Sequence, residues 1–270
     1  MAVQGVRGVR FFINEENLGY LKSCNKAVAQ ARGEFICLMN NDVEVTSGAI
    51  DALQDLLVRR VDAGVVGSKL VYPNGCLQEA GGILWNNGWA ANYGRFDDPL
   101  NYLYEYVRAV DYVSGASLMM RKALWDNLGG YDEHYCPAYG EDSDLALRVR
   151  QAGLKVLYQP RSVVVHHEGI SHGTSEERGL KSYQRVNRGK LAEKWAAVLK
   201  REQLPSSRGV FRARDRAALA KVVLVIDHYV PEPDRDAGSR TIFQMLQALV
   251  DHGFVVKFWP DNLNYKAEYV

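Results

Sequence analysis

The sequence predicts an α/β protein in which helices flank a mixed sheet, with a partial β-α-β unit at the C-terminal end. Three observations predict this class. Short apolar runs alternate with segments that carry apolar residues at helical spacing, and glycines follow several of those segments. After residue 221 the strand–helix–strand pattern begins again. Such alternation is typical of a sheet covered by helices on both faces.

The bulk composition is that of an ordinary globular protein. The chain has 270 residues, enough for one large domain or one domain and a fragment, with 47% hydrophobic and 24% charged residues. The net charge of +1 gives no indication of a nucleic-acid partner. The four cysteines are far apart without a CxxC spacing, and no stretch is apolar enough to span a bilayer. We therefore expect a cytoplasmic protein without zinc or disulfides.

The N-terminal part should begin with strand, helix and strand. We expect a strand over 9–13 and a helix over about 21–31, which Gly33 ends in a left-handed conformation. Residues 35–39 lack polar alternation, so they predict a fully buried strand.

A second helix should follow Thr46 or Ser47, since either residue suits the N-cap position. Its apolar residues share one face: Ile50, Leu53, Leu56 and Leu57. A further strand begins near Val65. By contrast, 72–111 is rich in glycine, asparagine and aromatic residues, which predicts hairpins and a long loop rather than core.

The pattern continues up to residue 199. It predicts, in order, strand 117–120, helix 121–128, helix 143–152, strands 156–158 and 162–165, and helix 181–199. Gly129 and Gly153 should end the first two of these helices.

We expect three regions: a main domain over 1–199, a basic linker over 200–220 and a partial unit over 221–270. The linker and its flanking lysines contain seven basic residues and two acidic ones. A solvated linker is the favoured interpretation, and peripheral contact with anionic lipids at the inner face of the membrane is the alternative. The last region predicts strand 222–226, which should be buried, then helix 240–251 and strand 254–259.

Polar residues follow the apolar run at 35–39. Asp42 comes just after this run with Asn40 and Asn41, where a strand end would present the side chains at the edge of the sheet. A carboxylate there could ligate Mg²⁺ or Mn²⁺ on a diphosphate, whereas the structural alternative is an Asx turn or helix cap. Alone, the three residues favour the structural alternative.

Glu141 and Asp142 precede a predicted helix. One of them would cap it, and Asp142 could instead point into a cleft and accept a proton from a substrate hydroxyl. The positive end of the helix dipole should lower the pKa of this carboxyl group, which would keep it ionised as a weak base.

Two more motifs lie beside predicted strands. Because side chains alternate along a strand, one of His166 and His167 can face the site, and we favour His166 as a metal or phosphate contact. The segment Ser114-Gly115-Ala116 lacks bulky side chains. Either a ligand approaches its backbone closely, or the segment forms a tight bend.

In their order and spacing these stretches resemble the inverting family 2 glycosyltransferases of the GT-A fold, a Rossmann-like mixed sheet flanked by helices. The resemblance covers about residues 9–199. Each matching stretch is weak by itself, and the order and spacing of all of them together make the resemblance specific. The matching stretches include Asn17-Leu18-Gly19, Leu38-Met39-Asn40-Asn41-Asp42, Ser114-Gly115-Ala116, Leu128-Gly129-Gly130-Tyr131-Asp132, Gly140-Glu141-Asp142-Ser143-Asp144 and His166-His167-Glu168-Gly169.

This resemblance implies transfer of a sugar, with inversion, from a nucleotide-sugar donor to a glycan or lipid-linked glycan acceptor in bacterial surface polysaccharide synthesis. It implies that Asp142 is the catalytic base and that Asp42, helped by His166, holds a divalent metal, Mg²⁺ or Mn²⁺. It also implies donor or acceptor contacts from Asn17, Gly19, Asn41, Ser114, Gly115, Ala116 and Glu141.

The sequence departs from the family pattern. Asn40 stands in place of the first carboxylate of the metal motif, so either metal affinity should be lower or metal binding should depend more on His166. We expect the two strand–helix units that usually bind the base and ribose to be missing, which would leave the donor pocket without one wall. Residues 221–270 resemble the opening of a GT-B-type glycosyltransferase.

Two other function classes are compatible with these residues. The chain could be a non-catalytic binding or scaffolding module of a larger polysaccharide-synthesis protein. A metal-dependent hydrolase built on Asp42, Asp142 and His166 is disfavoured, because the sequence offers no second cluster of metal ligands.

Overall fold

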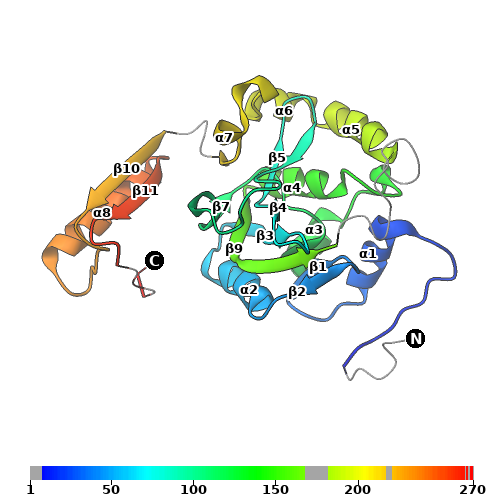
Figure 1. Ribbon diagram of the computed structural model, residues 1–270, viewed down its shortest axis with the longest axis horizontal. Coiled ribbons are helices and arrows are strands. Elements are labelled where there is room, and N and C mark those ends of the chain that lie inside the picture. The colour runs from blue at the N-terminus through cyan, green and yellow to red at the C-terminus, as the bar shows by residue number, and fades with distance from the viewer. Residues whose placement is uncertain (1–7, 168–181, 217–220, 265, 267, 270) are drawn as a thin grey trace. The chain divides into compact units, whose positions relative to one another are not determined.

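A mixed sheet forms the centre of the larger of two units in the computed structural model (Figure 1). The structure describes residues 8–167, 182–216, 221–264, 266 and 268–269. Its two units comprise residues 1–214 and 215–270, and each is described by itself. Within the described residues, the main sheet has seven strands and the order β1-β8-β3-β9-β2, with β4 beside β3 and β7 beside β9. The predicted α/β class with a mixed sheet is therefore confirmed.

The strands of the larger unit are β1 (Phe35–Met39), β2 (Val43–Val45), β3 (Ala63–Val71), β4 (Leu77–Glu79), β5 (Gly82–Leu84), β6 (Ala90–Asn92), β7 (Arg108–Ala109), β8 (Ser117–Arg121) and β9 (Lys155–His166). Its helices are α1 (Gly19–Ala29), α2 (Ala49–Arg59), α3 (Lys122–Leu128), α4 (Glu141–Gln151), α5 (Ser182–Lys194), α6 (Ala196–Glu202) and α7 (Val210–Ala213), with 3-10 turns at Tyr102–Tyr104, Glu133–Tyr135 and Ser206–Arg208.

The direction of the strands decides where the polar motifs meet. Strands β3 and β9 are parallel, and β8 lies antiparallel between β1 and β3. The start of β8 therefore lies at the edge of the sheet where β1, β3 and β9 end. This places Ser114-Gly115-Ala116, which precedes β8, beside Asn40, which follows β1, and an Asn40 N–H to Ala116 O hydrogen bond of 3.1 Å joins them.

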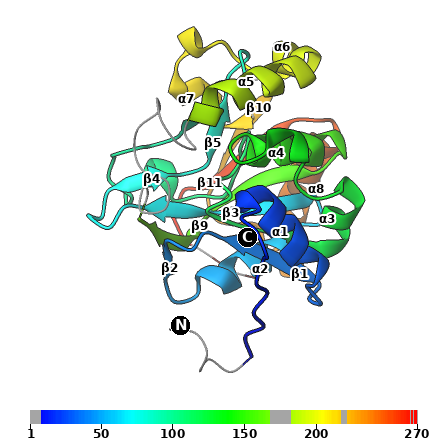
Figure 2. The same cartoon turned by 90° about the vertical axis from the view of Figure 1, so that its right-hand side faces the viewer.

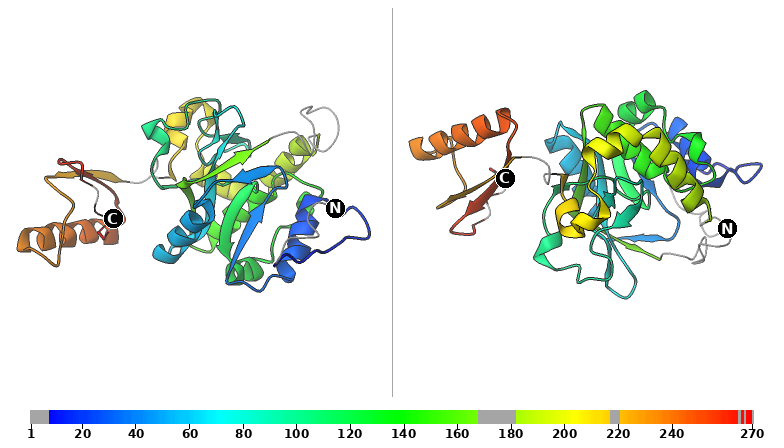
Figure 3. Two further views of the ribbon diagram at one scale, coloured as in Figure 1. Left: turned by 60° about the horizontal axis from the view of Figure 1, so that its bottom comes forward. Right: turned by 90° about the horizontal axis from the view of Figure 1, so that it is seen from above.

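Helices cover both faces of this sheet (Figure 2). On one face, Leu53 and Leu57 of α2 pack with Val66 of β3. On the other face, Leu145 and Val149 of α4 belong to a larger core that includes Val65. Helices α5 and α6 lie over this second face, as Figure 3 shows from above, and contribute Leu191 and Leu199 to the same core.

Several predicted elements have the expected bounds. Strand β1 covers 35–39, although its residues alternate between buried and half-buried rather than being fully buried. Helix α3 ends at Gly129, which has φ of 78° as the C-cap. The two strands predicted over 156–165 form one continuous strand, β9. The helix predicted over 181–199 is two helices, α5 and α6, and residue 181 lies outside the described residues.

The strand predicted over 9–13 is wrong. This segment has no regular structure and its apolar side chains are exposed, because none of the strands that the structure describes pairs with it. Gly33 is also not the end of α1: Gln30 follows the last helical residue, and Gly33 does not have a positive φ.

Two further expectations about local structure are wrong. Gly48, with φ of 76°, is the N-cap of α2, and Thr46 instead donates its hydroxyl to the Val163 carbonyl at 2.7 Å. Residues 72–111 do contain the β5–β6 hairpin, but they also contribute to the core. Their buried members include Leu77, Ile83, Leu84, Trp85, Tyr93 and Tyr104.

The smaller unit is a single β-α-β unit, as expected. Strands β10 (Val222–Asp227) and β11 (Val255–Pro260) are parallel, and α8 (Ala237–Asp251) connects them. Asp236 caps this helix by accepting the Ser239 N–H at 2.7 Å, so the helix starts three residues before the predicted position. The prediction of a buried β10 is wrong, since Leu224 and Ile226 are exposed. Among the helices described in both units, none is long and apolar enough to cross a membrane.

Candidate active site

Asp42 and His166 meet where β2 pairs with β9. Val43 lies opposite His166 in the antiparallel register, and the His167 N–H donates to the Asp42 carbonyl at 2.9 Å. These contacts bring His166 Nε2 to 3.3 Å from Asp42 Oδ1, with both side chains largely buried. We call Asn40, Asp42 and His166 the cation side of the site.

Neighbouring amides orient the His166 ring. Gln78 Oε1 lies 3.0 Å from His166 Nδ1, and because an amide oxygen can only accept, this contact suits a proton on Nδ1. The opposite nitrogen, Nε2, lies 3.4 Å from Asn40 Nδ2 and 3.3 Å from Asp42 Oδ1. His167 lies on the other side of the strand and pairs with Glu44 at 2.6 Å. The two histidines thus lie on opposite sides of the strand, as the alternation of side chains predicts.

The cation side fits a divalent metal that shares its coordination with a substrate. Asp42 Oδ1 and His166 Nε2 converge within 3.3 Å, a carboxylate and an imidazole lone pair facing one place. Across the described part of the chain, no three His, Cys, Asp or Glu side chains gather to hold a metal. Mg²⁺ and similar ions commonly use one or two protein ligands plus substrate phosphates. Two protein ligands therefore suit a metal that also binds a diphosphate.

Asp142 is held at the start of α4. Gly140, with φ of 92°, is the N-cap, so neither acidic residue caps the helix through its side chain. The Asp142 carboxylate accepts the Ser143 N–H at 2.6 Å, and the nearby Gly115 amide also acts to lower its pKa. Burial nevertheless raises the pKa of Asp142 above its usual value, because desolvation outweighs these hydrogen bonds. The expectation of a lowered pKa is therefore wrong, and Asp142 is a stronger base than the helix dipole alone would make it.

Glu141 is more deeply buried than its neighbour, with 7% of its surface exposed. Burial, followed by the negative charge of Asp142, raises its pKa to about 8. Its Oε2 atom is buried and makes no hydrogen bond within the described structure. A contact from Glu141 to donor or acceptor stays a prediction. We call Asp142, Glu141 and the segment Ser114–Ala116 the base side of the site.

The segment Ser114–Ala116 joins the two sides. Its Gly115 amide lies near the Asp142 carboxylate, and its Ala116 carbonyl accepts the Asn40 N–H at 3.1 Å. The Gly115 carbonyl accepts the Tyr20 hydroxyl at 2.9 Å, and a Cβ on Gly115 would lie 2.9 Å from that hydroxyl oxygen. A side chain at position 115 would thus collide with Tyr20. The bend interpretation has direct support, and a ligand contact from these three residues stays a prediction.

The remaining predicted contact residues lie at turns. Asn17 accepts the Gly19 N–H through Oδ1 at 3.0 Å, a turn that opens α1. Gly19 has φ of 71°, and a Cβ there would lie 3.2 Å from the Pro137 carbonyl oxygen. Asn41 is exposed beside Asp42. Their roles in donor binding stay predictions.

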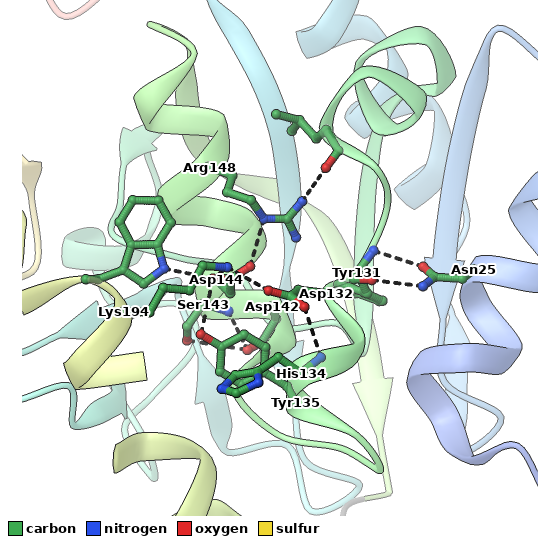
Figure 4. Close-up of polar contacts among 12 residues, drawn as sticks. Asn25, Tyr131, Asp132, His134, Tyr135, Asp142, Ser143, Asp144, Arg148 and Lys194 are labelled. Atoms are coloured by element: carbon green, nitrogen blue, oxygen red, sulfur yellow. Dashed lines mark hydrogen bonds and ion pairs between the residues drawn. The ribbon is translucent and has the colours of Figure 1, made fainter. Parts of the chain in front are cut away.

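The sequence did not identify Asp144 as the anchor of α4 (Figure 4). Its fully buried carboxylate accepts hydrogen bonds from the Trp195 indole at 2.7 Å, from Arg148 Nε at 2.7 Å and from the Tyr135 hydroxyl at 3.2 Å. Lys194 Nζ also lies at 2.7 Å. These contacts fix the first turn of α4, which carries Asp142, to α5. The i, i+4 spacing of Asp144 and Arg148 was the one sequence signal of this role.

Asn187 of α5 was also missed, and it holds the loop before Asp142. Its buried amide nitrogen donates to the carbonyls of Tyr135, Ala138 and Tyr139 at 2.7, 2.8 and 3.0 Å. Tyr139 and Gly140 both have positive φ, 74° and 92°. A non-glycine residue in this conformation persists where its surroundings enforce it, and Asn187 supplies that restraint.

Comparison with known proteins decides the family. Residues 2–128 match the profile of glycosyl transferase family 2. The chain is 30% identical over 230 residues to the N-acetylglucosaminyl-diphospho-decaprenol L-rhamnosyltransferase of Mycobacterium tuberculosis, a match that covers 74% of this chain and 73% of that protein. The chain belongs to glycosyl transferase family 2.

Two longer relatives match part of this chain over a small share of their own length. The O-antigen biosynthesis protein RfbC of Myxococcus xanthus is 32% identical over 154 residues, and the uncharacterized protein y4gI of Sinorhizobium fredii is 35% identical over 182 residues. These matches cover 54% and 64% of this chain, but the chain spans 12% and 20% of the two relatives.

The crystal structure of GalNAc-T7 with UDP, GalNAc and Mn²⁺ has the same fold, with a TM-score of 0.54 at 16% identity. The match covers 70% of this chain and 37% of that one. It confirms the GT-A-like fold that the sequence motifs implied.

Proposed function

We propose that this chain transfers a sugar from a nucleoside-diphosphate-sugar donor to an acceptor hydroxyl, with inversion, in bacterial surface polysaccharide synthesis. One observation carries the proposal. The segment Ser114–Ala116 places its Gly115 amide near the Asp142 carboxylate, and its Ala116 carbonyl accepts the N–H of Asn40, two residues before Asp42. One short piece of backbone thus lies between the proposed base and the proposed metal ligands. The similarity to a rhamnosyltransferase and to an O-antigen biosynthesis protein supports the reaction class.

In the proposed reaction Asp142 accepts the proton of the acceptor hydroxyl as that oxygen attacks the anomeric carbon. The bond from this carbon to the acceptor oxygen forms while its bond to the diphosphate oxygen breaks, which inverts the configuration. Asp42 and His166 would hold Mg²⁺ or Mn²⁺, which when bound neutralises charge on the leaving diphosphate. The UDP and Mn²⁺ of the GalNAc-T7 structure support this ligand class.

The test is Asp142→Asn, which keeps the shape of the side chain and removes the base. We expect transfer to fall by about 10²- to 10⁴-fold, while binding of a nucleoside diphosphate with Mn²⁺ is unchanged. Asp126→Asn, at an exposed position of α3, is the matched control and should retain full activity. Undiminished transfer by Asp142→Asn would refute the base assignment. A folded wild-type chain that binds no nucleoside diphosphate would instead favour a non-catalytic scaffold.

We also propose that the chain works at the cytoplasmic face of the membrane, on a glycan or lipid-linked glycan acceptor. Support comes from α7, where Val210 and Phe211 are exposed beside Arg208 and Arg212. Apolar side chains flanked by basic ones favour contact with anionic lipid. Co-sedimentation with vesicles containing phosphatidylglycerol should fall for Phe211→Ser. Equal binding to neutral vesicles would argue against this contact.

The smaller unit is assigned to the GT-B-type class as part of the same proposal. Its parallel strands β10 and β11 and its Asp236-capped helix support the assignment. Many nucleotide-binding folds share this strand–helix–strand arrangement, so the assignment needs a direct test. Adding a nucleotide-sugar should shift the amide NMR signals of residues 222–260.

A further inference from the structure

Strand β4 lies outside every motif of the site, yet its last two residues contact both sides of it. Gln78 and Glu79 are 2% and 1% exposed, a deep burial for polar side chains. Because they are consecutive in a strand, their side chains point to opposite faces. Strand β4 pairs with β3 at Leu70 and Val71. These two residues of β3 also pair with Val164 and Val165, near the end of β9.

Glu79 contacts the base side. Its Oε1 accepts the Ser114 N–H at 3.1 Å, and the amide of the next residue, Gly115, lies near the Asp142 carboxylate and lowers its pKa. Nearby, the Ser114 hydroxyl accepts the Ala116 N–H at 3.2 Å. Without Glu79, the part-buried Ser114 N–H would lose its acceptor one residue before the amide that lies beside the base. Such an N–H is rarely left without a partner in folded proteins.

Gln78 contacts the cation side. Its Oε1 lies 3.0 Å from His166 Nδ1, and when Nδ1 donates to it, the nitrogen that can bind a metal is Nε2, 3.3 Å from Asp42 Oδ1. Groups that hold the second nitrogen of a histidine ligand in this way affect metal affinity strongly, although they do not contact the metal.

We propose that Gln78 and Glu79 are positioning residues that align the cation side and the base side from one short strand. Gln78 sets which nitrogen of His166 is available to a metal, and Glu79 sets the position of the Gly115 amide beside Asp142. The proposal rests on the proposed function, and it assigns a separate measurable property to each of the two residues.

Glu79 is tested with a pair of variants. Glu79→Gln retains an acceptor oxygen, whereas Glu79→Leu removes it. We expect Glu79→Leu to lower kcat about 10- to 100-fold with donor KM changed less than about 3-fold, and Glu79→Gln to retain kcat within about 3-fold. Amide hydrogen exchange at Ser114 and Gly115 should accelerate in Glu79→Leu and not in Glu79→Gln. Equal loss in both variants, or unchanged exchange in Glu79→Leu, would overturn the role of Glu79.

Gln78 is tested by Mn²⁺ binding, followed by electron paramagnetic resonance with no donor present. Gln78→Leu should weaken Mn²⁺ binding about 10- to 100-fold, and Gln78→Glu, which keeps an acceptor oxygen, should retain it within about 3-fold. Glu79→Leu should leave Mn²⁺ affinity unchanged. If both leucine variants lose both properties while remaining folded by circular dichroism, the separation of roles is wrong.

The exchange and Mn²⁺ measurements need no turnover, so they remain decisive if the proposed function itself fails. A wild-type chain that transfers no sugar would refute the transferase assignment alone. The same chain with unaltered exchange and Mn²⁺ affinity in both leucine variants would refute the positioning roles as well.

Discussion

Asp142 is anchored through the interior of the larger unit, whereas Asp42 and His166 are held at the ends of strands, beside Gln78 and Asn40. Around the base side, Asp144 and Asn187 make seven contacts of 3.2 Å or less, four of which join α4 and its preceding loop to α5. On the cation side, Asp42 and His166 approach to 3.3 Å and Asn40 to 3.4 Å of the imidazole. The base side is thus fixed by the protein alone.

This difference matches what each side is proposed to do. A base must keep its geometry before any substrate arrives, since a small misplacement costs much of the rate. A metal site that shares its ligands with a diphosphate is completed by the donor. We therefore expect mutations on the base side to change protein stability, and mutations on the cation side to change metal affinity.

The largest expected effect is on stability, from Asp144→Ala. Removing this carboxylate leaves Arg148 without a buried ion-pair partner and the Trp195 indole without an acceptor. We expect the free energy of unfolding to fall by about 3 kcal/mol, measured by urea denaturation. Asp126→Ala breaks an i, i+4 pair of the same 2.7 Å length with Lys122, but an exposed one. It should cost less than about 1 kcal/mol. Equal losses would contradict the special role of Asp144.

Next in size is the effect of Asp42→Asn on metal affinity. Replacing one anionic ligand by a neutral amide should weaken Mn²⁺ binding about 10- to 100-fold, and the free energy of unfolding should change by less than about 1 kcal/mol. Titration calorimetry and thermal melting measure the two quantities. Glu44→Gln alters the outward-facing pair with His167 and should change neither. A large loss of stability in Asp42→Asn would remove the contrast between the two sides.

The sequence predicted the sheet well where local pattern decides structure. Strand β1, strand β8 and helix α3 have their expected bounds, because apolar runs and a terminal glycine define them. It failed where long-range pairing decides. Residues 9–13 have the composition of a strand but no neighbour to pair with, and 72–111 have the composition of a loop but bury Leu77 and Ile83.

The same division applies to the candidate site. Asp42, Asp142 and His166 could be singled out because each follows or begins a recognisable element. Gln78, Glu79 and Asn187 could not, since nothing local distinguishes a buried polar residue from an exposed one. Their roles depend on partners 35 to 88 positions away along the chain, as with Gln78 and His166. The direction of the Asp142 pKa shift was also set by burial, which the sequence did not reveal.

A third prediction concerns pH. Burial raises the pKa of Glu79 and of Glu141 to about 8 in the folded protein, above the 4.5 of an unperturbed glutamate. Between these values the folded state binds protons that the unfolded state has released, so stability falls as pH rises from 4.5 to 8. The slope should be about 1 kcal/mol per pH unit for each group. Glu141→Gln should reduce the slope of the unfolding free energy between pH 6 and 8 by about half, because Glu79 still contributes. Glu44→Gln, at an exposed position, should leave the slope as in wild type. An unchanged slope in Glu141→Gln would show that this group is ionised in the folded protein.

The smallest expected effect comes from restoring the carboxylate that Asn40 replaces. Asn40 Nδ2 lies 3.4 Å from His166 Nε2, so an aspartate there would add an anionic oxygen beside the two proposed ligands. Asn40→Asp should strengthen Mn²⁺ binding about 3- to 10-fold, because affinity for hard cations rises with the number of charged ligands. Asn41→Asp adds the same charge on an exposed neighbour and should give less than about a 2-fold increase, since solvent screens it. An equal increase in Mn²⁺ affinity in the two variants would mean that the added negative charge attracts the cation from any nearby position. Asn40 would then not face the cation.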